Sequence, residues 1–245
     1  MRHWLILFLV ALTGAAQAQK IRVAVAANAQ FVMEKLKAGF EKKTGLDVEV
    51  IVNSSGKLTT QIQNGAPFDV FLSADMKYPA AVDKAGLAAT KPKVYAYGLL
   101  VLWTRSDIDP AKGLAVLSDQ RIHKIAVANP RMAPYGATAI AVLAQQKRLE
   151  ALQPKIVYGE SIAQVNQYLI SGAVEAGFTA KSVVLEPSMQ GKGRWADVKG
   201  AEPMAQGVVL LKGARTDARQ FYDYLFSPEA RAIFQRYGYQ KPVHP

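Results

Sequence analysis

Short runs of apolar, often β-branched residues alternate along this chain with longer stretches in which apolar residues recur every three or four positions. The first pattern predicts strands buried in a sheet, and the second predicts amphipathic helices that cover it. The predicted strands are residues 21–26, 48–52, 69–72, 94–104, 125–128, 156–158, 176–178 and 208–211. The predicted helices are residues 31–44, 57–63, 74–85, 137–149, 162–171, 214–226 and 228–237. Strands and helices that alternate in this order predict an α/β fold.

The strand–helix units fall into two groups, separated by the long apolar strand that ends at Thr104 and closed by the strand near 206–211. This order predicts two doubly wound lobes joined by two crossing strands. The expected lobes are residues 19–100 with 207–245, and residues 101–206. Ligands of open α/β sheets bind at the carboxyl ends of the strands, and paired lobes can close around a ligand by a hinge. The binding site is therefore expected in a cleft between the lobes.

The N-terminus has the pattern of a secretory signal peptide. Met1-Arg2-His3 gives a short positive start, and Trp4 to Leu12 is an apolar run far shorter than the ~20 residues of a membrane-spanning helix. Ala16-Gln17-Ala18 matches the small-x-small cleavage site, which predicts cleavage after Ala18 and an exported protein. The alternative is a buried N-terminal helix. There are no cysteines, so neither a lipoprotein anchor at the cleavage point nor the usual zinc clusters can form.

The formal net charge is +11, which suits nucleic acid, acidic membranes or small anions, or simply a solvated basic surface. Because there is no basic run and no interleaving of aromatic and basic residues, a nucleic-acid partner is not expected. Catalytic signatures such as a Gly-x-Ser-x-Gly elbow, a phosphate loop or His-Glu-x-x-His are also missing. We therefore expect a protein that is not an enzyme. A secreted hydrolase that uses Ser54 or Ser55 stays open as an alternative.

Polar residues follow four of the predicted strands, each directly before a helix. They are Asn28, Ser55, Tyr135 and Ser161, the last followed by Ile162. Helix N-termini carry unpaired N–H groups and a partial positive charge, which together can hold an oxyanion. Each residue also has a plainer explanation, because Asn28, Ser55 and Ser161 suit helix N-caps and Tyr135 suits a core or rim position. Together the four turns predict an anion site in the cleft.

Neutral donors favour an anion that carries no proton, because every oxygen of such an anion is an acceptor. The O–H of a protonated anion would face another donor and leave buried groups unpaired, at ~1–3 kcal/mol each. A cavity fitted to a large oxyanion also leaves a smaller one with stretched hydrogen bonds, which separates molybdate from sulfate. Sulfate, phosphate or an organic anion stays open as an alternative ligand. A phosphate site needs a carboxylate acceptor, and among the four turns Glu160 is the residue that could supply one.

Several motifs make the chain resemble the periplasmic molybdate-binding proteins of ABC importers over nearly the whole length that follows the signal peptide. The motifs are Ala26-Ala27-Asn28, Asn53-Ser54-Ser55-Gly56, the run from Gln61 to Asp75 with Gly65-Ala66-Pro67, Tyr97 to Trp103, and Asn129-Pro130 with Ala133-Pro134-Tyr135-Gly136. The resemblance implies the type II periplasmic-binding fold and the ligand molybdate or tungstate. It also implies a periplasmic location, delivery to the membrane permease of an ABC importer, no cofactor and a monomer. Bound metal is expected only as the oxyanion itself.

The resemblance also implies which residues bind the anion. They are Asn28, Ser55, Tyr135, the backbone N–H near Ile162, and Ala27, where some members supply a further donor. Many members have Ala-Ser after the first strand, whereas this chain has Ala27-Asn28. Many also carry Gly-Ile-Val-Tyr late in the second lobe, where this chain has Gly177-Phe178-Thr179-Ala180. The chain therefore resembles a branch that uses Asn on the first loop and Tyr135 on the third.

Overall fold

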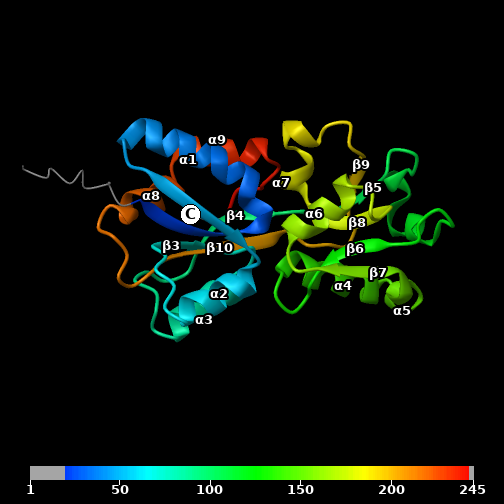
Figure 1. Cartoon of the computed structure of the whole chain (residues 1–245), viewed down its shortest axis with the longest axis horizontal. Helices are drawn as coiled ribbons and strands as arrows, with labels where there is room; N and C mark the ends of the chain where they lie inside the picture. The colour runs from blue at the N-terminus through cyan, green and yellow to red at the C-terminus, as the bar shows by residue number, and fades with distance from the viewer. Residues whose placement is uncertain (1–19, 243–245) are drawn as a thin grey trace, which may run out of the picture.

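Two five-stranded β-sheets, each flanked by helices, form two lobes that lie side by side (Figure 1). The computed structural model describes residues 20–242, so the predicted signal peptide lies outside the described residues. The first sheet has the order β2-β1-β3-β10-β4, with β1 (Ile21–Ala26), β2 (Val48–Asn53), β3 (Val70–Leu72), β4 (Lys93–Gly98) and β10 (Met204–Leu210). The second has the order β7-β6-β8-β5-β9, with β5 (Leu100–Thr104), β6 (Ile125–Ala128), β7 (Ile156–Gly159), β8 (Ala176–Ala180) and β9 (Arg194–Asp197). We name the first sheet with its helices lobe 1 and the second with its helices lobe 2.

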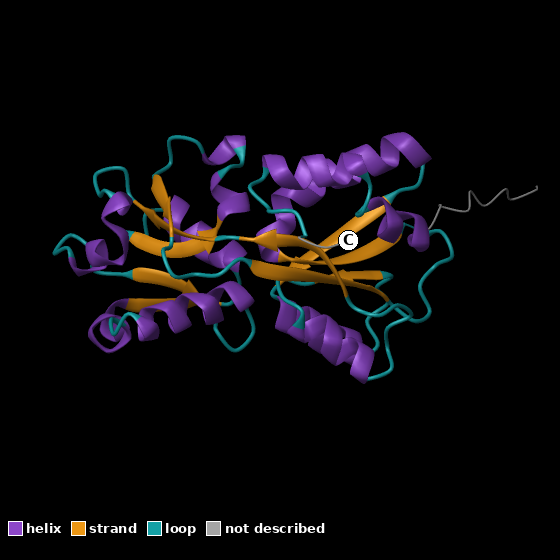
Figure 2. Cartoon of the chain, turned by 180° about the vertical axis from the view of Figure 1, so that it is seen from behind, coloured by secondary structure: helices purple, strands orange, loops and turns teal. Residues whose placement is uncertain are grey.

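Helices cover both faces of each sheet (Figure 2). Lobe 1 contains the short 3-10 helix η1 (Ala27–Ala29) and the helices α1 (Gln30–Thr44), α2 (Ser55–Gln63), α3 (Lys77–Lys84), α8 (Ala218–Tyr224) and α9 (Pro228–Arg236). Lobe 2 contains α4 (Pro134–Gln145), α5 (Leu149–Leu152), α6 (Ile162–Ile170) and α7 (Lys181–Val184), with the 3-10 helices η2 (Pro110–Ser118), η3 (Gln153–Lys155) and η4 (Pro187–Met189). The predicted α/β architecture of two lobes is confirmed.

The alternation of side chains along β1 decides which helices pack on which face of the lobe 1 sheet. Val23 and Val25 belong to the core formed with α1, α8 and α9. Ala24 points the other way and packs with Leu58 of α2. Figure 1 accordingly shows α1 and α9 on one side of this sheet and α2 and α3 on the other. Because both faces are covered, β1 is apolar along most of its length, and each fully buried Val contributes roughly 1.5–3 kcal/mol.

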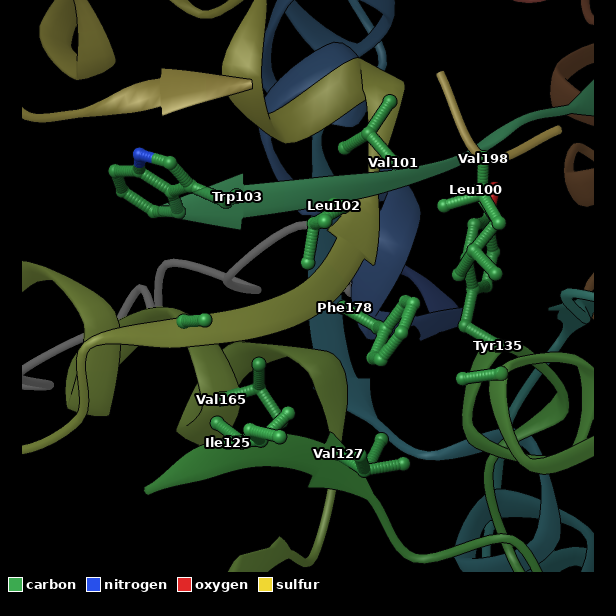
Figure 3. Close-up of a cluster of buried hydrophobic side chains, with 14 of the residues drawn as sticks. Leu100, Val101, Leu102, Trp103, Ile125, Val127, Tyr135, Val165, Phe178 and Val198 are labelled. Atoms are coloured by element: carbon green, nitrogen blue, oxygen red, sulfur yellow. The ribbon is translucent and has the colours of Figure 1, made fainter. Parts of the chain in front are cut away.

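The core of lobe 2 is one continuous cluster of apolar side chains (Figure 3). Leu102 of β5, Val127 of β6 and Phe178 of β8 all belong to it, together with Val165 of α6. Every residue of these three strands is buried, which is why their sequences are largely apolar. The same cluster includes Tyr135 at the start of α4. The first turn of α4 is thus anchored by packing.

The apolar segment 94–104 is not the one continuous strand that its pattern predicts. β4 ends at Gly98 and β5 begins at Leu100, and the two strands belong to different sheets. A Cβ atom at position 98 would lie only 2.1 Å from the Tyr135 hydroxyl oxygen and 2.8 Å from Gln206 Nε2, so any side chain there would force these groups to move. The chain returns to lobe 1 between β9 and β10. These two connections join the lobes, as predicted.

Local hydrogen bonds move other element boundaries from their predicted positions. α3 begins at Lys77 rather than at residue 74, because Ser73 and Asp75 bond to each other and Asp75 accepts from the backbone N–H of Tyr78. α4 begins earlier than predicted, at Pro134, since proline suits the first position of a helix. The edge strand β9 was not predicted at all, because its residues are largely exposed and lack an apolar pattern.

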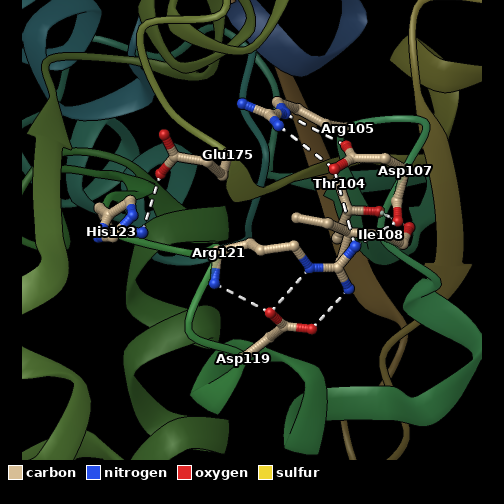
Figure 4. A network of polar contacts seen from close by, with 8 residues as sticks. All are labelled: Thr104, Arg105, Asp107, Ile108, Asp119, Arg121, His123 and Glu175. Carbon is tan, nitrogen blue, oxygen red and sulfur yellow. Dashed lines mark hydrogen bonds and ion pairs between the residues drawn. The ribbon is translucent and has the colours of Figure 1, made fainter.

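A polar network holds two loops on the surface of lobe 2 (Figure 4). The Arg121 side chain donates to both carboxylate oxygens of Asp119, at 3.0 and 2.7 Å, and to the Asp107 carbonyl oxygen at 2.9 Å. Arg105 donates to the Asp107 carboxylate. These hydrogen bonds lower the pKa of the Asp107 and Asp119 carboxyl groups.

No helix of residues 20–242 is long and apolar enough to cross a bilayer.

Candidate functional site

A small cavity lies between the lobes, where the carboxyl ends of several strands meet the first turns of the helices that follow. It is lined by Ala26, Ala27, Asn28, Ser54, Ser55, Ala74, Ala133, Pro134, Tyr135 and Ile162. The structure therefore brings together all five residues predicted to bind the anion. Ala27 contributes no side-chain donor and lies in η1, next to Asn28. Every residue of the lining is uncharged, so a ligand here would be held by neutral groups.

Ser55 is oriented by a backbone group of its own lobe. Its hydroxyl oxygen accepts from the Ala74 N–H at 3.0 Å, and the residue is only 1% exposed. The hydroxyl hydrogen is then left to donate towards the cavity. The helix cap is supplied by Ser54, which accepts from the Lys57 N–H at 3.4 Å. Ser55 is therefore the first residue of α2 and not the N-cap that the plainer interpretation assigned.

The two nine-residue helices at the cavity each begin with a backbone N–H group that has no partner among the described residues. Ser55 and Ile162 are the first residues of α2 and α6, so their N–H groups have no acceptor within the helix. Within residues 20–242 neither N–H donates to any other group. Ser161 is the N-cap of α6 and accepts from the Gln164 N–H at 3.5 Å. Each helix thus presents a free donor and the positive end of its dipole to the cavity.

Tyr135 lies in the first turn of α4, and its phenol stays protonated at neutral pH. Burial raises the pKa of this hydroxyl well above its usual value of 10.0, and the nearby Tyr239 and Tyr95 raise it further, whereas Asn28 lowers it. The Tyr135 hydroxyl is buried and has no hydrogen-bond partner among the described residues. A buried hydroxyl without a partner is costly, by ~1–3 kcal/mol. An acceptor bound in the cavity would remove that cost.

The Asn28 side chain, predicted to donate to the anion, donates in this structure to two neighbouring residues. Its Nδ2 donates to Gln206 Oε1 at 2.9 Å and to the Tyr239 hydroxyl at 3.0 Å. Gln206 is itself fixed, because its Nε2 donates to the carbonyl oxygens of Ala74 at 3.0 Å and Met204 at 2.9 Å. Both amide hydrogens of Asn28 are therefore in use. The backbone N–H is the donor that Asn28 can offer to a ligand.

Three buried residues around Asn28 were missed by sequence reasoning: Ser182, Gln206 and Tyr239. Gln206 and Tyr239 do not lie between a strand and the helix that follows it, and Ser182 lies at the start of α7, directly after β8, where no helix was predicted. The pattern of polar turns therefore did not include them. Gln206 does carry a signal, because it is a fully buried polar residue inside the apolar strand β10. Ser182 and Tyr239 both donate to the Asn28 carbonyl oxygen, at 2.7 and 3.2 Å. They hold the loop around Asn28 in place without lining the cavity.

Glu160 does not line the cavity, although it was the carboxylate that could have served a phosphate ligand. It forms an ion pair with Lys57 across the gap between the lobes, and its side chain is 66% exposed. Further contacts between the lobes lie close by. The Gly56 N–H donates to the Met132 carbonyl oxygen at 2.9 Å, and the Tyr78 hydroxyl donates to the Arg131 carbonyl oxygen at 3.0 Å. The lobes are therefore closed over the cavity.

The larger pockets elsewhere are not lined by the predicted turns. One of about 350 Å³ on lobe 1 is lined in part by Lys20, Arg22, Lys212 and Arg215. Two of its cations already have partners, since Arg22 pairs with Glu49 at 3.3 Å and Arg215 with Asp217 at 2.7 Å. No group of three or more His, Cys, Asp or Glu residues that could hold a metal ion occurs in residues 20–242. The interlobe cavity is thus the candidate binding site.

Comparison with known proteins assigns the family. Residues 21–240 match the model of the family described as bacterial extracellular solute-binding protein. This chain belongs to that family. The family is one of solute-binding proteins rather than enzymes, in agreement with the missing catalytic signatures.

The relatives of this solute-binding protein include several molybdate-binding proteins. It is 41% identical over 233 residues to the molybdate-binding protein ModA of Azotobacter vinelandii, covering 93% of this chain and 92% of that one. It is 38% identical to ModA of Rhodobacter capsulatus, covering 91% and 89%. The solved periplasmic molybdate-binding protein of Azotobacter vinelandii superimposes with a TM-score of 0.86 at 34% identity, covering 91% of this chain and 100% of that one. The fold expected from the resemblance is thereby confirmed.

Proposed function

We propose that this solute-binding protein captures molybdate or tungstate in the interlobe cavity, in the periplasm, and delivers it to the permease of an ABC importer. The observation that carries the proposal is the closed cavity between the lobes, which is lined only by uncharged residues and offers hydroxyl and backbone N–H donors. The names of the relatives from Azotobacter vinelandii and Rhodobacter capsulatus support the same ligand class.

The donors on Ser55, Tyr135, Asn28 and Ile162 suit a dianion whose four oxygens are all acceptors. Bonds to a charged acceptor are stronger than neutral ones, and burial keeps water from competing for them. The first turns of α2, α4 and α6 add positive dipole ends from both lobes. An anion in the cavity therefore makes favourable contacts with both lobes and stabilises the closed form.

The alternatives fit the structure less well. A protonated phosphate needs an acceptor for its hydroxyl, and Glu160 is instead paired with Lys57 outside the cavity. A serine hydrolase needs a base beside Ser55, but that hydroxyl accepts from the Ala74 N–H, and the cavity lining contains no histidine. Sulfate shares the charge and shape of molybdate, so size alone would separate the two. Sulfate is therefore one of the anions titrated to test the proposal.

Isothermal titration calorimetry of the chain that begins at Gln19 tests the proposal. We expect submicromolar binding of molybdate and tungstate, sulfate weaker by at least ~100-fold, and no measurable phosphate binding; a hundredfold difference corresponds to ~2.7 kcal/mol. Sulfate binding as tight as that of molybdate would overturn the assignment. A thermal-shift series with the same anions gives an independent measure, because selective binding to the folded state raises its stability.

We further propose where the signal peptide is cleaved, that the mature protein is a monomer, and which residues form each lobe. Signal peptidase cleaves after Ala18, which mass spectrometry of the exported protein would test. The mature protein is a monomer, which light scattering coupled to size-exclusion chromatography would test. The lobes comprise residues 19–100 with 207–245, and residues 101–206. The two chain crossings, at Leu99 and between β9 and β10, lie within a few residues of these limits, although Leu100 belongs to β5 of lobe 2 and residues 204–206 to β10 of lobe 1.

A further inference from the structure

A buried polar cluster lies behind the candidate site and ties the two lobes together. Its centre is the Asn28 carbonyl oxygen, which accepts from the Ser182 hydroxyl at 2.7 Å and from the Tyr239 hydroxyl at 3.2 Å. Ser182, Tyr239 and Asn28 are 3%, 4% and 2% exposed, so water does not compete for these bonds. Neither Ser182 nor Tyr239 lines the cavity.

The members of this cluster belong to different lobes. Asn28 follows β1 of lobe 1, and Tyr239 follows α9 and lies beside the bridge between Tyr97 and Gln240, also in lobe 1. Ser182 is on α7, which follows β8 of lobe 2. The bond from Ser182 to Asn28 therefore crosses from one lobe to the other. The bond from Tyr239 to Asn28 stays within lobe 1.

A second interlobe bond lies next to the first. The Tyr237 hydroxyl of lobe 1 donates to Glu186 Oε2, just beyond α7, at 2.7 Å. The turn at Gly238 packs closely against α7 and the residue after it, because a Cβ atom there would lie 3.0 Å from a side-chain carbon of Lys181 and 2.7 Å from a methyl carbon of Leu185. Residues 182–186 of lobe 2 thus rest on residues 237–239 and on Asn28.

Opening of the lobes would break the bond from Ser182 to Asn28 and keep the bond from Tyr239 to Asn28. The Asn28 carbonyl would keep its bond from Tyr239, which moves with the same lobe. The Ser182 hydroxyl would lose its partner and be hydrated instead. A bond that is present in the closed form and lost in the open form shifts the equilibrium towards the closed form. Since the apparent affinity scales with the population of the binding-competent state, such a bond tightens binding without contact with the ligand.

We propose that Ser182 is a positioning residue that holds the closed, anion-binding conformation through its interlobe hydrogen bond to Asn28. The proposal rests on the proposed function, because it assigns how affinity for the oxyanion is set. It makes the affinity depend on a group that never touches the anion. Ser182 therefore acts equally on every ligand that the closed site accepts, and it contributes affinity rather than selectivity.

The test is the Ser182→Ala variant of the chain that begins at Gln19, titrated with sodium molybdate and with sodium tungstate. We expect both dissociation constants to rise by the same factor, about three- to tenfold, which matches the loss of one neutral hydrogen bond. The rise should come from faster dissociation, with an association rate close to that of the unmodified chain. Ser182→Thr keeps the hydroxyl and should restore most of the affinity.

Ser171→Ala is the matched control. The Ser171 hydroxyl also donates to a carbonyl oxygen, that of Tyr168 at 3.3 Å, but within lobe 2 at the end of α6. This variant should bind both anions as the unmodified chain does. A role of Ser182 in folding alone would lower the melting temperature and leave the dissociation constants of the folded protein unchanged, and that result would overturn the proposal.

Tyr237→Phe provides a second variant that does not alter α7 itself. It removes the neighbouring interlobe bond to Glu186, so it should also speed dissociation of both anions. If the unmodified chain bound neither anion, the proposed function would fail. If it bound them but Ser182→Ala left the dissociation rate unchanged, the proposed function would stand and this inference would be wrong, whatever the effect of Tyr237→Phe.

Discussion

The replacement of Ser55 by alanine is the sharpest test of the candidate site. Ser55 has two roles, because its oxygen accepts from the buried Ala74 N–H and its hydrogen is free to donate into the cavity. Loss of a hydrogen bond to a charged acceptor costs about 1.5–3 kcal/mol, which is a factor of roughly 10–150 in the dissociation constant. The orphaned Ala74 N–H should in addition lower the free energy of unfolding of the unliganded protein by about 1–3 kcal/mol.

Calorimetry with molybdate and urea unfolding without ligand separate these two effects. Ser227→Ala is a suitable control, because Ser227 caps α9 far from the cavity and accepts from the Ala230 N–H at 3.1 Å. It should cost about 1 kcal/mol of stability and leave the affinity unchanged. If Ser55→Ala bound molybdate within a factor of two of the unmodified chain, Ser55 would not donate to the anion and the site as described would be wrong.

Three further predictions concern the hinge and the pH dependence of stability. Gly98→Ala should lower both stability and affinity, because its Cβ would lie 2.1 Å from the Tyr135 hydroxyl; overpacking typically costs 1–3 kcal/mol, and urea unfolding with calorimetry would detect it. Burial, followed by the bond to Glu186, raises the pKa of Tyr237 to about 12. Its unfolded pKa is near 10, so the stability it gives is complete below about pH 10 and is lost as the pH rises towards about 12. An ultraviolet titration should show one late-ionising tyrosine fewer in Tyr237→Phe. Hydrogen bonds from Arg121 lower the pKa of Asp119, so the stability from this carboxylate is present above its unfolded pKa near 4 and lost as the pH falls. Asp119→Asn should therefore flatten the acid side of the stability curve measured by urea unfolding.

The candidate site could be predicted as a set of turns because each turn follows a local rule. A strand, a small polar residue and a helix start occur within a few positions of one another around Ser55 and around Ile162. The structure places these turns as expected, and all five predicted residues line one cavity. Which atom of each residue faces that cavity was not predictable. Asn28 shows this, because its amide is turned to Gln206 and Tyr239.

The apolar pattern by itself determined the order of strands and helices, the α/β class and the position of the turns, because these depend on neighbours along the chain. It could not divide the segment 94–104 between two sheets, since Leu99 looks like any other apolar strand residue. The division is seen in the sheet pairing, with Gly98 at the end of β4 packed against Tyr135 of the other lobe. Tertiary structure alone also brought Gln206 to Asn28 across 178 positions and Ser182 to Asn28 across 154. Such contacts depend on the order of the strands and on the closure of the lobes, which no local pattern encodes.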